Sequence, residues 1–267
     1  MKAAVAGCGR MGLPMARAMQ AAGHQVTGFD IRPSSQFGDF AAHMTDDPAA
    51  VAAHPVVFSV VRDIPQTEAL LFHDQALLHQ PQLPALLVIS STLSPRYIAD
   101  LAGRMPAGTR LVDAPMSGAP VAAEEARLSF MLGGETADLD RLQPLLDAMG
   151  TAFHRMGAVG AGMTAKVLNN FLAATSTAAV RRVLDWADHL GVEERALLDV
   201  MHDSSGQTWF GSHFDRIEFA RHGNAPDNTI AILQKDVESL LDALPRDARD
   251  GLAPVVIEAL AALKPRP

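Results

Sequence analysis

A lysine and an asparagine stand four residues apart near the middle of the chain, directly after the glycine-rich segment 157–162. Apolar residues at helical spacing follow, so Lys166 and Asn170 are expected on one face of a helix, one turn apart. An ammonium group and an amide placed together could hold a carbonyl oxygen and supply it with a proton. A surface lysine at the start of a solvated helix gives the same pattern, so this segment alone leaves both interpretations open.

The elements that would position such a pair alternate between strands and helices in the N-terminal half. Residues 3–6 form a short apolar run bounded by glycine, which predicts a buried parallel strand. Residues 13–22 predict a helix that ends at Gly23, and residues 24–29 predict a second strand. This order of strand, helix and strand is the context in which a glycine-rich turn can bind a dinucleotide.

The turn itself carries the pattern G-x-G-x-x-G, made by Gly7, Gly9 and Gly12. Gly7 permits a tight turn, Gly9 lets a pyrophosphate approach the backbone, and Gly12 lets the helix pack closely on the strand. We expect Arg10 and Met11, which lie between these glycines, to contact the cofactor as well. A tight turn without a ligand is the alternative, and the complete strand–helix–strand context disfavours it.

The residues after the second strand bear on the choice of cofactor. Asp30 stands 18 positions after Gly12, where a carboxylate can accept hydrogen bonds from the ribose hydroxyls and would repel a 2'-phosphate. The guanidinium of Arg32 could bind such a phosphate, although an arginine before Pro33 is expected to lie exposed in the loop. We therefore predict NAD as the cofactor, with NADP possible, and assign Asp30, Ile31 and Arg32 to its site.

The alternation continues, and the carboxyl ends of the strands should form the ligand crevice of a doubly wound, mostly parallel sheet. Val61, Arg62 and Thr92 follow two of these strands and are expected to line the nicotinamide side. A later loop carries Ser117 and Gly118, whose hydroxyl and N–H groups could bind an anion, although such residues also make ordinary turns. The remaining expected strands are 56–61, 86–89, 110–113 and 127–133, and the expected helices are 47–53, 64–72, 95–104 and 138–148.

The C-terminal part is predicted to be nearly all helix. A helix over residues 163–190 is longer than most globular helices and suits a segment that joins two domains. A polar loop carries Trp209, and a later helix carries Lys235 and Asp236, a kind of charged pair that usually faces solvent. Three more helices are expected at residues 192–202, 230–244 and 251–263.

Composition limits the class of protein. The chain has 267 residues, 48% of them hydrophobic, which allows a large core and one or two domains. The order of the expected elements divides it into an α/β dinucleotide-binding domain at 1–160 and an all-α domain at 161–267. A net charge of -8 without a basic run argues against nucleic acid as a partner. No apolar stretch approaches the roughly 18 residues of a membrane span, and the single cysteine, Cys8, is typical of a reducing cytoplasm. The His, Cys and acidic residues lack the spacing of metal ligands.

Four stretches of the chain together resemble the beta-hydroxyacid dehydrogenase family, which contains 3-hydroxyisobutyrate dehydrogenase and tartronate semialdehyde reductase. They are residues 7–12, 113–118, 160–170 and 235–236. The resemblance implies a Rossmann domain followed by a helical domain, with the active site in the cleft between them. It also implies that Lys166 is catalytic and that Lys235 reaches the cofactor. The expected substrate contacts are Ser117, Gly118, Asn170 and, from the polar loop, Trp209.

Such an enzyme would interconvert a short, 3-hydroxyisobutyrate-like hydroxy acid and its semialdehyde, with Lys166 as general acid and base. A free lysine has a pKa of about 10.4, which is too high for an efficient base, so the role requires burial. Three departures from the family leave the substrate open. Ala119 and Ala126 replace glycines common in relatives, and Ile89 stands near a position that is often acidic.

Three other interpretations compete with this one. A 6-phosphogluconate dehydrogenase would be much longer and would need basic residues for the phosphate of its substrate. An imine-reductase-like enzyme generally replaces the lysine, and a catalytically silent NAD-binding or scaffold protein has no need of it, so Lys166 and Asn170 argue against both. Apolar residues on several faces of the long helix further predict a homodimer or homotetramer, the assembly of relatives in the family.

Overall fold

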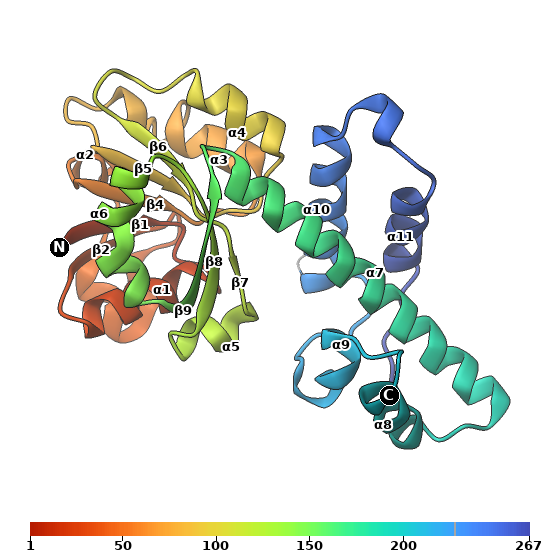
Figure 1. Cartoon of the computed structure of the whole chain (residues 1–267). Helices are drawn as coiled ribbons and strands as arrows, with labels where there is room; N and C mark the ends of the chain where they lie inside the picture. The colour runs from red at the N-terminus through yellow and green to blue at the C-terminus, as the bar shows by residue number, and fades with distance from the viewer. Residues whose placement is uncertain (227) are drawn as a thin grey trace. The chain divides into compact units, whose positions relative to one another are not determined.

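The computed structural model describes residues 1–226 and 228–267, which form two compact units (Figure 1). The first unit is Met1–Lys166 and the second is Val167–Pro267. Helix α7, Ala161–Leu190, begins in the first unit and continues into the second.

The first unit is built on a nine-stranded sheet with the order β3-β2-β1-β4-β5-β6-β8-β7, which confirms the predicted doubly wound fold. The first six strands are parallel, β8 is antiparallel to β6 and β7, and β9 pairs in parallel with β8. The chain order changes direction between β1 and β4, where ligands bind in open α/β sheets. The strands are β1 Lys2–Ala6, β2 Gln25–Phe29, β3 Met44–Thr45, β4 Val56–Ser59, β5 Leu86–Ile89, β6 Arg110–Asp113, β7 Met116–Ser117, β8 Leu128–Gly133 and β9 Gly150–Gly157.

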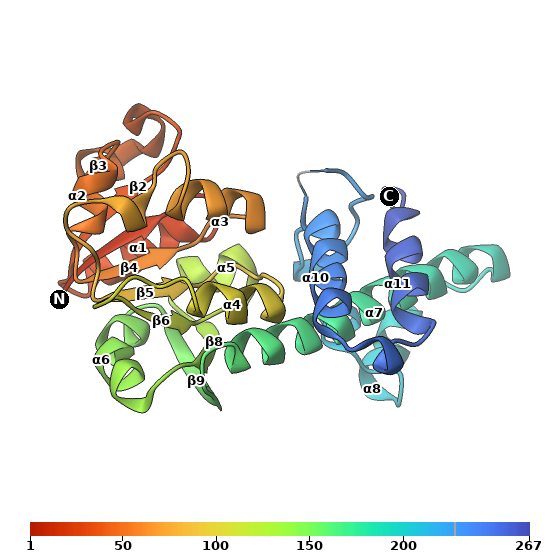
Figure 2. The ribbon, with the colours of Figure 1, turned by 90° about the horizontal axis from the view of Figure 1, so that it is seen from above.

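Helices cover both faces of this sheet (Figure 2). Successive strand residues point to opposite faces, so Ala3 and Val5 of β1 join one buried cluster and Ala4 and Ala6 join the other. Helices α1, α5 and α6 pack in the first cluster, and α2, α3 and α4 in the second. Burial on both sides explains the unbroken apolar runs of the parallel strands. The helices are α1 Gly12–Ala21, α2 Pro48–Ala52, α3 Ile64–Leu71, α4 Pro95–Ala102, α5 Ala119–Glu124 and α6 Thr136–Asp147, with 3-10 helices η1 Ser34–His43 and η2 Leu77–His79.

The structure contains six elements that the sequence did not predict in this unit, namely η1, β3, η2, β7, α5 and β9. Strand β7 has two residues and α5 has six, too few for an apolar period to appear. Strand β9 is mostly exposed after its first residue and therefore lacks the apolar run of a buried strand. The glycine-rich segment before Lys166 thus connects the exposed β9 to α7.

The two alanines that stand in place of glycine adopt the backbone conformation that glycine favours. Ala119 has a φ of 57° and Ala126 a φ of 53°, both in the left-handed region. A non-glycine residue in this region costs roughly 1–2 kcal/mol because Cβ approaches the following carbonyl oxygen. Ala119 follows Gly118 as the first residue of α5, and Ala126 lies two residues after the helix ends, so the departures strain the backbone at both ends of α5.

The second unit consists of α7 from Val167 onwards and the shorter helices that pack on it. Its core contains Leu184, Phe210, Ile230 and Val237. Helices α10 and α11 lie side by side in both views (Figures 1 and 2). Among the described residues, no helix has the length and apolar character needed to cross a membrane. The shorter elements are α8 Glu194–Asp203, α9 Trp209–Ser212, η3 Phe214–Arg216, α10 Thr229–Ala243, η4 Arg246–Ala248 and α11 Leu252–Ala261.

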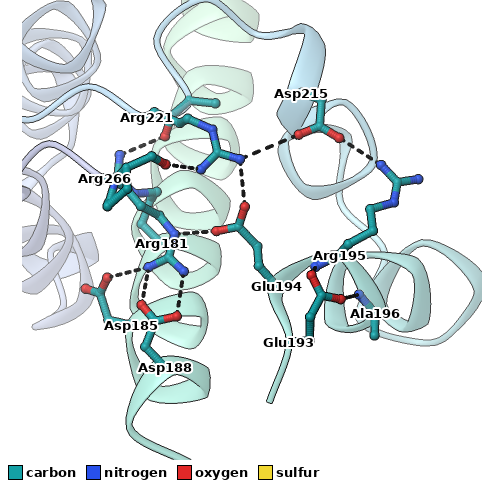
Figure 3. Close-up of polar contacts among 12 residues, drawn as sticks. Arg181, Asp185, Asp188, Glu193, Glu194, Arg195, Ala196, Asp215, Arg221 and Arg266 are labelled. Atoms are coloured by element: carbon teal, nitrogen blue, oxygen red, sulfur yellow. Dashed lines mark hydrogen bonds and ion pairs between the residues drawn. The ribbon is translucent and has the colours of Figure 1, made fainter. Parts of the chain in front are cut away.

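Two arginines hold the C-terminal segment of this unit against α7, Arg181 of the helix and Arg266 of the segment, whose ion pairs Figure 3 shows. Arg181 donates hydrogen bonds of 2.7 Å to the carbonyls of Ala220 and His222 and one of 2.5 Å to that of Lys264. Arg266 forms ion pairs with three acidic side chains, Asp185, Asp188 and Glu194. The three carbonyls satisfy the two terminal nitrogens of the buried Arg181 guanidinium, although its Nε has no hydrogen-bond partner among the described residues, and they hold the segment against α7.

Candidate active site

The glycine loop after β1 packs tightly against the end of β4 and is open on its other side. A Cβ on Gly7, which has a φ of 94°, would lie 2.8 Å from the carbonyl carbon and oxygen of Val60 and 2.9 Å from the nitrogen of Val61. A Cβ on Gly12 would lie 2.0 Å from the carbonyl oxygen of Gly7. Among the described residues, no heavy atom outside the adjoining chain lies within 4 Å of a Cβ built on Gly9. Space beside Gly9 at the start of α1 therefore fits the pyrophosphate of a dinucleotide.

Asp30 and Arg32 form an ion-paired unit at the end of β2. The Nε and Nη2 atoms of Arg32 donate to the two carboxylate oxygens of Asp30 at 2.9 and 3.0 Å, and Nη2 also donates to the carbonyl of Cys8 at 3.0 Å. Burial acts to raise the pKa of Asp30, but the hydrogen bonds from Arg32 outweigh it and hold that pKa below its usual value. Arg32 lies at the surface as expected, yet its guanidinium is bound to the cofactor loop and stacks over Phe37.

The other predicted cofactor contacts of this unit lie after the carboxyl ends of β1, β2, β4 and β5. Arg10 is exposed in the glycine loop, and Met11 occupies the N-cap position of α1. Ile31 is 84% exposed, and the backbone N–H of Arg62 donates to Gln66. Thr92 is half-buried after β5. The carboxyl ends of parallel strands meet at one edge of a sheet, so these positions suit a single extended ligand, and their roles stay predictions.

Ser117 and Gly118 belong to the turn between β7 and α5. Ser117 pairs with Ser129 of β8 and is half-buried. Gly118 has a φ of 136°, and a Cβ there would lie 2.5 Å from the Cβ of Ala122. Only glycine fits this position, so the shape of the turn is imposed by its sequence.

Lys166 is a buried side chain near the start of α7, and the surface-lysine interpretation is wrong. Only 7% of its surface is exposed. The start of α7 is held by Asp113 at the end of β6, whose carboxylate accepts the N–H groups of Gly160 and Met163 at 2.6 Å each. Burial raises the pKa of Asp113 to about 6, although these N–H groups favour the ionised form.

In the second unit, Asn170 is joined to Asp236 and Lys235 by a chain of polar contacts. The Nδ2 atom of Asn170 donates to Oδ2 of Asp236 at 2.6 Å, and Nζ of Lys235 lies 2.8 Å from Oδ1 of the same carboxylate. Asp236 is 1% exposed, so the expectation that this charged pair faces solvent is wrong for the aspartate. This carboxylate fixes the carboxamide of Asn170 and holds the ammonium of Lys235.

Trp209 begins α9 and keeps 58% of its surface exposed. Its ring stacks on that of His213, with centroids 5.4 Å apart. The expected contact between Trp209 and a substrate stays a prediction.

The predicted residues thus fall into two sets, one in each unit. Sequence analysis assigned no role to one aspartate in each set, Asp113 in the first and Asp236 in the second. Asp113 was visible only as the last residue of a strand. Asp236 carries a clearer signal, because it falls on the apolar stripe that Leu233, Val237 and Leu240 form along α10. A charge on such a stripe is buried and needs a polar partner, which Asn170 and Lys235 provide.

Comparisons with known proteins place this geometry among characterised dehydrogenases. Residues 2–160 match the NAD binding domain of 6-phosphogluconate dehydrogenase, and residues 160–262 match the NAD-binding domain of NADP-dependent 3-hydroxyisobutyrate dehydrogenase. A 3-hydroxyisobutyrate dehydrogenase of Pseudomonas aeruginosa is 34% identical over 209 residues, which are 76% of this chain and 70% of that protein. An NAD-dependent L-serine dehydrogenase of the same organism is 32% identical over 207 residues, again 76% of this chain and 70% of that protein.

A solved structure shows the same fold over nearly the whole chain. It is the Mycobacterium tuberculosis 3-hydroxyisobutyrate dehydrogenase with L-serine, which is 28% identical. Its TM-score is 0.80, with 97% of this chain and 92% of that chain covered.

Proposed function

The chain belongs to the beta-hydroxyacid dehydrogenase family and is an NAD(P)-dependent hydroxyacid dehydrogenase, and we propose that it interconverts a short 3-hydroxy acid and its semialdehyde with Lys166 as general acid and base. The observation that carries the proposal is the burial of Lys166 one helical turn before Asn170, in a chain with a complete dinucleotide-binding loop. The glycine loop and Asp30 would hold a nicotinamide cofactor, which would supply the hydride acceptor for the alcohol carbon. The neutral amine of Lys166 takes the hydroxyl proton in oxidation, and its ammonium returns that proton in reduction.

The remaining predicted residues hold the substrate and the cofactor. Ser117, Gly118 and Asn170 are proposed to bind the carboxylate and hydroxyl of the substrate. Asn170 has two donor hydrogens on Nδ2, one of which Asp236 accepts, so the second is available for a ligand. Lys235 is proposed to contact the cofactor while Asp236 restrains it.

The proposed substrate is a 3-hydroxy acid with a small group on C2. Two proteins support this class, a 3-hydroxyisobutyrate dehydrogenase and an L-serine dehydrogenase, because the substrates in their names share a carboxylate, a primary alcohol on C3 and a small C2 substituent. Only the C2 substituent differs, a methyl group against an amino group. The common part of the two molecules is therefore the recognition element that we propose for this chain.

A substrate screen tests the proposed function. The purified protein is given NAD or NADP with short 2- and 3-hydroxy acids, and reduction of the cofactor is followed by absorbance. We expect the best 3-hydroxy acid to exceed its 2-hydroxy isomer in kcat/KM by at least about tenfold, because only the 3-hydroxyl reaches Lys166 when the carboxylate is bound. Its methyl ester should be at least about tenfold poorer, since the charged hydrogen bonds are lost. An equal kcat/KM for the acid and its methyl ester would contradict the proposed binding mode.

We also propose that the chain forms at least a homodimer through α7. Four large apolar side chains lie along one face of this helix and are 49–79% exposed, namely Leu168, Leu172, Trp186 and Leu190. A continuous exposed apolar face on a helix is typical of a subunit interface.

Light scattering at micromolar concentration should therefore give at least twice the mass of one chain. Leu172→Asp combined with Trp186→Asp should shift the protein towards monomer, because two charges would be buried without partners. Val200→Asp, at an exposed apolar residue of α8, is the matched control and should leave the mass unchanged. A monomeric wild-type protein contradicts the proposal.

A further inference from the structure

Asp113 bonds strand β6 to the start of the helix that carries Lys166. Its Oδ1 accepts the backbone N–H of Gly160 and its Oδ2 that of Met163, at 2.6 Å each. Met163 lies in the first turn of α7, and Lys166 follows it by three residues, one turn further along the same helix. The orientation of the first turn therefore sets the direction in which the lysine side chain leaves the helix.

The surroundings of Asp113 are shaped to admit a carboxylate and little else. A Cβ on Gly133 would lie 2.3 Å from Oδ1 of Asp113, and a Cβ on Gly162 would lie 2.9 Å from Oδ2. A Cβ on Gly162 would also lie 2.4 Å from the carbonyl oxygen of Met131. Glycine at positions 133 and 162 is thus needed for the helix start to approach the carboxylate.

The charge of Asp113 also suits its place in the fold. The first N–H groups of a helix have no partners within the helix and carry a partial positive charge, which a carboxylate stabilises. The side chain is fully buried, and burial raises its pKa to about 6, so the fold keeps an ionised group where a neutral one would be easier to bury. Costs of this kind are concentrated at functional sites.

Resting on the proposed function, we propose that Asp113 is a positioning residue, which clamps the first turn of α7 and so holds the Lys166 ammonium in its reactive orientation. Asp113 has no exposed surface, so it cannot touch a substrate and acts only through the helix. Strand β6 also leads through Ala114 and Pro115 to the turn of Ser117, so the same residue fixes the start of the substrate loop.

A double-mutant cycle tests this role. It compares the wild type, Asp113→Asn, Lys166→Ala and the double variant, with kcat measured on the best substrate of the screen. Asparagine keeps the shape of the side chain but presents an NH2 group to one of the two N–H donors, which loosens the clamp. We expect Asp113→Asn to lower kcat about tenfold in the wild type, with the KM for NAD unchanged. In the Lys166→Ala background the same change should alter kcat less than about twofold, because no lysine remains to be positioned.

A merely structural role for Asp113 gives a different result. Loss of folded enzyme would lower kcat by the same factor in both backgrounds, and that outcome overturns the proposal, as does an unchanged kcat in Asp113→Asn. The matched control is Asp138→Asn, another buried aspartate of the first unit, which pairs with Arg110 and should leave kcat within about twofold of wild type. Asp113→Ser, which removes the buried charge and keeps one acceptor, repeats the cycle if the asparagine variant does not fold.

The failures of the two proposals can be told apart. If Lys166→Ala alone keeps more than a tenth of wild-type kcat, the lysine is not the proton donor, and both proposals fall. If Lys166→Ala is inactive as expected and the effect of Asp113→Asn is equal in both backgrounds, only the positioning role is lost.

Discussion

Replacing Lys166 by alanine is expected to lower kcat by about a hundredfold or more, the usual scale for a lost general acid–base group. The side chain is buried and sits beyond the clamped first turn of α7, so no solvent water at the surface can easily take over its proton transfer. NAD binding, measured by fluorescence titration, should stay nearly unchanged. The proposed NAD contacts are the glycine loop after β1 and Asp30 after β2, whereas Lys166 lies on α7. A variant that keeps more than a tenth of wild-type kcat would show that the proton comes from another group.

Two further variants test the separate roles of Lys166 and Asn170. Lys166→Arg keeps a cation but should be nearly as poor as alanine, since a guanidinium does not give up its proton at working pH. Asn170→Ala should cost less in kcat and should raise the KM for the substrate, because its amide holds the substrate and not the migrating proton. Equal effects of the alanine variants at both positions on KM would contradict this division of roles.

The α/β half of the chain could be predicted from sequence because its strands are buried on both faces. Residues 56–58 and 86–89 are unbroken apolar runs, which is the pattern that a parallel sheet imposes. Strand β9 could not be found in this way, because it lies at the end of the sheet and most of its side chains are exposed. Its pairing with β8 is a tertiary contact, which the local sequence pattern does not indicate.

Candidate site residues could be proposed from sequence where one residue type carries a function, but not where a contact joins distant segments. The glycines of the cofactor loop have a fixed spacing within six residues, and Lys166 and Asn170 are one turn apart. Asp113 bonds to residues 47 and 50 positions further along the chain, and Asp236 bonds to Asn170 across 66 positions. Both aspartates act on a neighbouring residue and not on a ligand, so their own sequence context gives little sign of them.

The wild-type enzyme is expected to use NAD at least about tenfold better than NADP in kcat/KM, a difference of about 1.4 kcal/mol. Oδ1 of Asp30 accepts both the backbone N–H and Nε of Arg32, whereas Oδ2 accepts Nη2 and keeps a second acceptor site, so a ribose hydroxyl can bind there without displacing the arginine. A 2'-phosphate would have to compete with Asp30 for the guanidinium and would lie against a carboxylate. The ion pair therefore favours NAD over NADP.

Asp30→Ala should lower kcat/KM for NAD about thirtyfold, since hydrogen bonds to a charged group contribute about 1.5–3 kcal/mol. The same change releases Arg32 from its ion pair, so NADP should be used as well as NAD or better. Arg32→Ala is the matched variant on the other side of the pair, and it should weaken NADP further while leaving NAD within about threefold of wild type. Steady-state kinetics with both cofactors on all three proteins decide the question. A wild-type kcat/KM at least tenfold higher with NADP than with NAD would mean that Arg32 leaves Asp30 and binds the 2'-phosphate. The Asp30 carboxylate would then not determine the cofactor specificity.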